Sequence, residues 1–224
     1  MWYFKRKIVV VMEPKINYDK EMMKIISALN SPKSLLLHSC CAPCSSACIE
    51  RLTPYFDITI LYYNPNIEPL EEYEKRKNEE IRFIKEYPNI NKLDIIDCDY
   101  DNAKFLQIAK GLENEPERGK RCLKCYNLRM EYTALKAKEL GYDYFATTLT
   151  LSPLKDSEVL NKIGYALSKK HNIAYLPSDF KKQNGYKRSI ELSKEYNLYR
   201  QNFCGCIYSK KVSGNTLVTT YNVL

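Results

Sequence analysis

The chain has 224 residues, 45% hydrophobic content and a formal net charge of +8 at pH 7, with nine cysteines and two histidines. This length allows one large domain with an extension and a sizeable buried core. No apolar run approaches the roughly 18 residues of a membrane span, which excludes an integral membrane protein of the helical type, and the positive charge favours a polyanionic partner.

Residues 1–32 are interpreted as an N-terminal extension, in which a short strand-like run precedes a helix over 18–29. The apolar run after the basic residues 5–7 is too short for a secretory signal, and Glu13 and Pro14 follow it instead of a small-residue cleavage site. We therefore expect a cytoplasmic protein, in which cysteines stay reduced.

From residue 34 onward, predicted strands and helices alternate. Continuous apolar runs are typical of strands covered on both faces. Strands are expected at 34–39, 57–63, 93–98, 143–148 and 173–176, and helices at 45–52, 70–87, 101–110, 122–140, 157–170 and 186–196. The alternation predicts an α/β fold with a doubly wound, mainly parallel sheet. This domain is expected to span 33–211, with a C-terminal tail at 212–224.

Seven of the nine cysteines fall in three short groups. They are Cys40-Cys41-Ala42-Pro43-Cys44, Cys122-Leu123-Lys124-Cys125 and Cys204-Gly205-Cys206. The first group follows the first strand of the sheet, at the edge where ligand sites gather in doubly wound folds. In a reducing compartment, such groups indicate metal or redox chemistry rather than structural disulfides.

The number of thiols limits the kinds of metal site. Two closed zinc sites need eight ligands, whereas seven thiols supply one four-thiolate cluster and one three-ligand site with an open position. His38 is interpreted as a core residue and His171 as a surface residue, so thiolate dominates any site and iron–sulfur chemistry is favoured. Cys48 and Cys98 are interpreted as inert buried thiols.

The second cysteine group lies at the start of a predicted helix, where Cys122 and Cys125 share a face. The positive helix end, with Arg121 and Lys124 beside it, is expected to favour thiolate over thiol. A zinc half-site explains this spacing equally well, and a redox-active dithiol equally explains the Cys204–Cys206 pair. The residues alone leave these alternatives open.

Six motifs, in chain order between residues 34 and 208, resemble the epoxyqueuosine reductases of the QueH family. They are the first cysteine group, Tyr63-Asn64-Pro65-Asn66-Ile67, Glu72-Tyr73-Glu74-Lys75-Arg76, Arg121-Cys122-Leu123-Lys124-Cys125, Thr147-Thr148-Leu149 with Ser152-Pro153-Leu154-Lys155, and Tyr199-Arg200-Gln201-Asn202-Phe203-Cys204-Gly205-Cys206.

The resemblance implies a fold of the adenine nucleotide α-hydrolase-like (Rossmann-like) type, in which a metal site replaces the phosphate loop. No glycine follows the first strand to let backbone amides wrap a phosphate. The implied ligands of a [4Fe–4S] cluster are Cys40, Cys41, Cys122 and Cys125. The implied catalytic residues are Cys44, Cys204 and Cys206, which would bind a second metal ion, iron; alternatively, the last two form a redox-active disulfide.

The resemblance also implies an oxidoreductase of tRNA queuosine biosynthesis, which reduces the epoxide of epoxyqueuosine at the wobble position with electrons from an external low-potential donor. Substrate-binding residues are expected to be Tyr63, Asn64, Asn66, Arg121, Tyr199, Arg200, Gln201 and Asn202. Two alternatives are an ATP-dependent tRNA-modifying enzyme of the same fold and a non-enzymatic, zinc-bound RNA-binding module.

Overall fold

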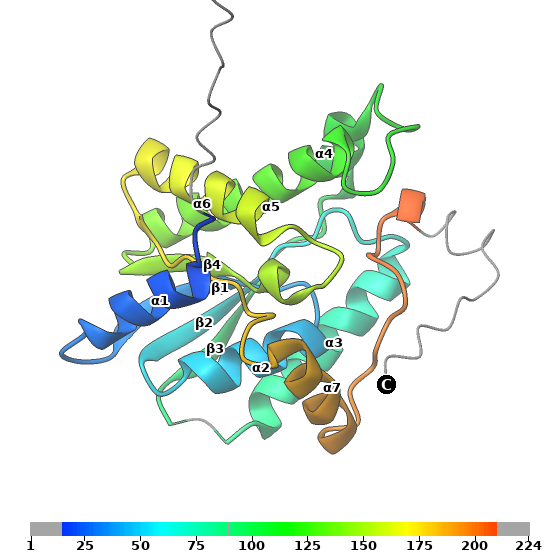
Figure 1. Cartoon of the computed structure of the whole chain (residues 1–224). Helices are drawn as coiled ribbons and strands as arrows, with labels where there is room; N and C mark the ends of the chain where they lie inside the picture. Colours follow the sequence, from blue (N-terminus) through cyan, green and yellow to red (C-terminus); the bar gives the residue numbers. More distant parts are fainter. Residues whose placement is uncertain (1–14, 89, 210–224) are drawn as a thin grey trace, which may run out of the picture.

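A computed structural model describes residues 15–88 and 90–209 (Figure 1). Its five strands form one parallel sheet in the order β3-β2-β1-β4-β5. They are β1 (Lys33–His38), β2 (Phe56–Tyr62), β3 (Leu93–Asp97), β4 (Tyr144–Thr147) and β5 (Ala174–Tyr175). The order confirms the predicted doubly wound α/β fold. The predicted strand-like N-terminal run and the tail at 212–224 lie outside the described residues.

Helices cover both faces of the sheet (Figure 1). One layer holds α2 (Ala42–Leu52), α3 (Leu70–Glu86) and α7 (Gly185–Glu195), and the other holds α4 (Asn102–Ala109), α5 (Lys120–Glu139) and α6 (Ser157–His171). A short 3-10 helix, η1 (Thr148–Leu151), follows β4 where the predicted strand would have continued. None of the described helices is long and apolar enough to cross a bilayer.

The central strand β1 supplies both hydrophobic cores, because successive side chains of a strand point to opposite faces. Leu35 and Leu37 pack in the core beneath α2 and α7, whereas Leu36 packs in the core beneath α5 and α6. All three are fully buried. This two-sided burial explains why the strand reads as an uninterrupted apolar run.

Helix α1 (Tyr18–Ser27), which the sequence places in the extension, packs against the same core as α2. Met22 and Ile26 are buried there, and Asn17 caps the helix by accepting a hydrogen bond from the Lys20 amide at 3.1 Å. Arg51 of α2 forms an ion pair with Asp19. Burial and charge therefore both attach α1 to the domain.

The carboxyl ends of β1, β2 and β4 meet at one edge of the sheet, with His38 beside Leu61 on one side and Thr147 on the other. The chain order of the strands reverses between β1 and β4. The loop after β1 therefore opens at the topological switch point, where doubly wound folds bind ligands.

Replacement of Met22 by Ala tests the attachment of α1. The fully buried side chain should leave a cavity that lowers the free energy of unfolding by about 2–5 kcal/mol, measured by urea denaturation. The control is Leu140→Ala, because Leu140 is 51% exposed, and it should change stability by less than about 0.5 kcal/mol. Equal effects of the two variants would show that α1 adds nothing to the core.

Candidate metal centre

Cys40, Cys41 and Cys44 form a compact group of potential metal ligands at the switch point. Their Sγ atoms all lie within 4.8 Å of one another, and those of Cys40 and Cys41 are 3.8 Å apart. No other set of three potential ligands in the described part of the chain is this compact. These three thiols can hold a metal ion or part of a metal cluster.

Local backbone geometry brings the three thiols together. Cys41 is extended (φ −179°) and precedes α2, and its carbonyl accepts hydrogen bonds from the amides of Cys44 and Ser45 at 3.0 and 3.1 Å. Pro43 fits the first turn because that turn has no use for its missing N–H. No side chain caps α2, so its positive end stays available to anionic sulfur.

The three thiols differ in acidity. Hydrogen bonds from the Cys41 and Cys44 thiols lower the pKa of Cys40, and the positive charges of Arg129 and Lys155 lower it further. Interaction with Cys40 and burial raise the pKa of both Cys41 and Cys44. The group therefore holds its first negative charge on Cys40.

The other two cysteine groups meet each other at the first turn of α5. Burial raises the pKa of Cys122, and the neighbouring Cys204 and Cys206 thiols raise it as well. Burial likewise raises the pKa of Cys125 to about 12. The expectation that the helix end favours thiolate here is therefore wrong for the metal-free protein, because burial outweighs the opposing effects of Arg121 on Cys122 and of Arg129 on Cys125. Cys125 and Cys206 also share a small apolar cluster with Phe105.

Arg129 links all three groups. Its side chain is 1% exposed, and its guanidinium donates to His38 Nε2 at 3.2 Å and to Asn64 Oδ1 at 2.6 Å. Burial alone would lower its pKa, but the sulfurs of Cys125, Cys40 and Cys204 raise it. Among the described residues no carboxylate forms an ion pair with Arg129. A buried charge needs compensation, and the sulfurs of Cys125, Cys40 and Cys204 are placed to provide it.

His38 positions this guanidinium. Burial and the adjacent Arg129 lower its pKa to about 3, so the imidazole is neutral. Because Nε2 accepts from Arg129, Nδ1 carries the proton and donates to Thr147 Oγ1 at 2.9 Å. The predicted core role of His38 is confirmed.

Glu80 is a buried carboxyl beside the first group. Ser39 Oγ donates to its Oε2 at 3.2 Å, while Oε1 has no hydrogen-bond partner. Burial raises the pKa of Glu80 to about 8, and the charge of Cys40 adds to this effect. At neutral pH this side chain is therefore mostly protonated.

A polar pocket of about 550 Å³ opens beside Lys155, in the loop before α6. The sulfurs of Cys204, Cys40 and Cys44 raise the pKa of Lys155 against the effect of burial. Lys155 therefore connects the pocket electrostatically to the cysteine groups, although no cysteine is among its lining residues. Arg118, Lys181 and Lys182 also line it, together with acidic residues at the start of α6.

The segment that carries Cys204 and Cys206 is fixed to α3. Arg76, in an ion pair with Glu72 at 2.7 Å, donates to the Cys204 carbonyl at 3.3 Å. Tyr199 donates its hydroxyl to Glu72 at 3.1 Å. Gly205 has φ +111°, and a Cβ there would lie 2.9 Å from Ile67 Cγ1. The motif at 72–76 thus holds the motif at 199–206.

Several predicted substrate-binding residues make contacts within the protein instead. Arg121, expected to bind substrate, is buried and donates to the carbonyls of Leu112, Glu113 and Glu115 at 2.8–3.1 Å, so it holds that loop instead. Asn64 donates to the Ser39 carbonyl at 2.8 Å.

Tyr63 stacks on Tyr132 with ring centroids 3.8 Å apart, and Arg200 donates to Ser193 Oγ at 3.0 Å. These contacts account for both predicted residues as part of the framework.

Three predicted residues keep polar groups available. Gln201 donates to Cys41 Sγ at 2.8 Å, which places it directly on the first cysteine group. The side-chain oxygens of Gln201 and Asn66 are buried without hydrogen-bond partners, and Asn202 is exposed. Of the predicted set, these three are the most available to a ligand.

The sequence interpretation missed Arg129, Glu80 and Lys155 as functional residues. For Arg129 a signal existed, because it follows Cys125 by four positions and so shares its helix face. Glu80 lies on the inward face of α3 with Tyr73 and Phe83, where a carboxylate interrupts an apolar stripe.

Fold and site together define a doubly wound α/β protein with a compact group of potential metal-ligating cysteines at its switch point. The family described as "Epoxyqueuosine reductase QueH" matches residues 35–212. The chain belongs to this family, in agreement with the resemblance of its motifs.

Relatives from several bacteria carry the same name. An epoxyqueuosine reductase QueH of Streptococcus pyogenes serotype M1 is 43% identical over 220 residues, covering 95% of this chain and 86% of the relative. That of Staphylococcus epidermidis is 45% identical over 208 residues, covering 89% and 87%. The Thermotoga maritima protein is 34% identical over 182 residues, covering 79% and 90%.

Glu80→Gln tests the buried carboxyl. Since the folded pKa is raised from 4.5 to about 8, the stability that Glu80 contributes is full below pH 4.5 and is lost as pH rises toward 8. The advantage of the Gln variant in unfolding free energy should therefore grow by roughly 3 kcal/mol between pH 5 and pH 8. Urea denaturation of the metal-free proteins measures it. A difference independent of pH would contradict the burial of this charge.

Proposed function

We propose that this protein reduces the epoxide of epoxyqueuosine at the tRNA wobble position to the alkene of queuosine. The reaction takes up two electrons and two protons and releases the oxygen as water. Family membership supports this function. The observation that supports placing the reaction at this site is the convergence of three cysteine groups on Arg129. Arg129 is a buried cation with no carboxylate partner among the described residues.

The donor set fits an iron–sulfur centre. We assign Cys40, Cys41, Cys122 and Cys125 to a [4Fe–4S] cluster. The remaining thiols, Cys44, Cys204 and Cys206, are assigned to a second iron, with a redox-active Cys204–Cys206 disulfide as the alternative. A four-thiolate cluster is anionic, so it satisfies the buried guanidinium and the adjacent Lys155. Such a centre supplies low-potential electrons, and a metal ion with an open site supplies Lewis acidity.

The substrate base is proposed to enter the polar pocket beside Lys155. The wobble base lies in a single-stranded loop, so it can reach a pocket without melting a duplex. Gln201 donates to Cys41 Sγ, and we assign its unpartnered oxygen, with the side chains of Asn66 and Asn202, to hydrogen bonds with the base on the cysteine side of the site. Arg118 and Lys182 are exposed at the pocket and can contact phosphates.

The structure argues against the two alternatives. An ATP-dependent enzyme of this fold would use the loop after β1 for phosphate, and here Cys40, Cys41 and Cys44 occupy that loop. A structural zinc module would leave three of seven thiols without a role. We place the protein in the cytoplasm, because its thiols must stay reduced to bind metal.

Cys44→Ala tests the division of roles among the cysteines. The variant should lose turnover of epoxyqueuosine-containing tRNA while it keeps most of its absorption at about 400 nm, because the cluster ligands remain. Anaerobic purification, absorbance and single-turnover analysis measure both properties. Cys48→Ala is the matched control, since Cys48 is buried and donates to the Cys44 carbonyl, and it should keep both. Full activity of Cys44→Ala would count heavily against the assignment.

The double variant Arg118→Ala/Lys182→Ala tests the tRNA-binding surface. Each lost phosphate contact should reduce the slope of log affinity against log salt by about 0.7, so the pair should reduce it by about 1.4. Filter binding of tRNA over a range of salt concentrations measures the slope. Lys85→Ala/Lys138→Ala removes two exposed lysines outside the pocket and should leave it unchanged. A salt-insensitive wild type would refute this mode of binding.

A further inference from the structure

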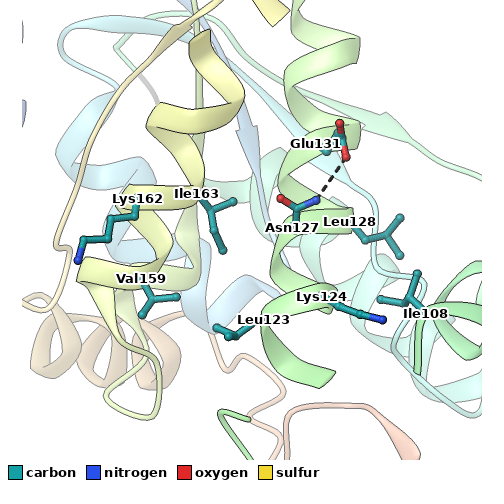
Figure 2. Close-up of a pocket in the computed structure, with 9 residues that line it drawn as sticks. All are labelled: Ile108, Leu123, Lys124, Asn127, Leu128, Glu131, Val159, Lys162 and Ile163. Carbon is teal, nitrogen blue, oxygen red and sulfur yellow. Dashed lines mark hydrogen bonds between the residues drawn. The ribbon is translucent and has the colours of Figure 1, made fainter. Parts of the chain in front are cut away.

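A second groove, of about 560 Å³, crosses the outer side of α5 between α4 and α6 (Figure 2). Its apolar lining comes from Ile108, Leu123, Leu128, Val159 and Ile163. Neither the metal centre nor the polar pocket beside Lys155 uses these side chains. The groove is therefore an apolar surface without an assigned role.

This groove shares the first turns of α5 with two of the proposed cluster ligands, Cys122 and Cys125. Leu123, 39% exposed, stands in sequence between Cys122, which is half-buried, and Cys125, which is buried. A helix with its side chains is only about 10–12 Å wide. An electron carrier seated here would be separated from the metal centre by little more than the first turn of α5.

The charges around the groove favour an acidic protein. Lys124 forms no ion pair within the described ranges, and it lies near the positive end of α5. The acidic side chains are already compensated: Glu158 pairs with Lys162 at 2.6 Å, and Glu131 pairs with Lys170. RNA would need several free cations for its phosphates, whereas an apolar centre with a weakly positive rim suits a protein interface.

We propose that this groove docks a small, acidic one-electron carrier protein of the ferredoxin or flavodoxin class. The inference rests on the proposed function, because the chain must receive electrons from outside. Each encounter oxidises one reduced carrier and delivers one electron to the metal centre. Two encounters supply the two electrons that, with two protons, convert the epoxide into the alkene and water.

Val159→Glu tests the docking surface, because it puts a negative charge into the groove on α6, away from the cysteines. Stopped-flow bleaching of the anaerobically purified, cluster-containing protein measures the reduction rate without tRNA. Reduced acidic bacterial ferredoxin should reduce the variant at least 10-fold more slowly than the wild type. Methyl viologen radical, which needs no docking, should reduce both at the same rate.

Leu135→Glu is the matched control on α5, since Leu135 is 48% exposed and lies outside the groove; it should behave as the wild type with both reductants. Lys162→Glu reverses a charge on the exposed rim and should make reduction by ferredoxin several-fold slower, most strongly at low salt. If Val159→Glu slows reduction by both reductants, the Lys162→Glu result decides between docking and a structural effect. Sedimentation of each variant is measured in parallel.

Two outcomes would overturn the docking proposal. The first is that reduced ferredoxin reduces the wild type, Val159→Glu and Lys162→Glu at equal rates. A wild-type dimer that Val159→Glu dissociates would assign the groove to a second copy. A wild type that methyl viologen also fails to bleach would instead contradict the proposed metal centre itself.

Discussion

The site is organised by one electrostatic requirement, which is the compensation of a guanidinium buried at the switch point of the sheet. Arg129 is held by a neutral imidazole and an amide, and neither can neutralise its charge. Cysteine sulfur from three distant chain segments raises the pKa of Arg129 against the effect of burial. The proposed metal–thiolate centre is anionic and would compensate this buried charge.

The family motifs are explained by how they hold one another. The acidic and basic residues at 72–76 fix the segment at 199–206 to α3, and Asn64 joins the end of β1 to Arg129. Gly205 allows that segment to approach Ile67 closely. Substrate and electrons are assigned separate routes, with the polar pocket beside Lys155 for the base and the groove across α5 for the carrier.

The sheet could be predicted because β1 and its neighbours are buried on both faces, which leaves apolar runs between amphipathic helices. Helix ends followed local chemistry, as at Asp101, which caps α4. The thiol acidity at Cys122 and Cys125 could not be predicted, because burial depends on packing against the Cys204–Cys206 segment. Arg121 was misassigned for the same reason: a sequence shows its charge but not the three carbonyls that it binds.

The metal content of the wild-type protein, purified without oxygen, tests this account most directly. If the three cysteine groups hold an iron–sulfur centre around Arg129, the protein will be brown and will contain acid-labile sulfide, with at least four irons per chain expected for the cluster. A colourless protein with stoichiometric zinc and no sulfide would contradict it.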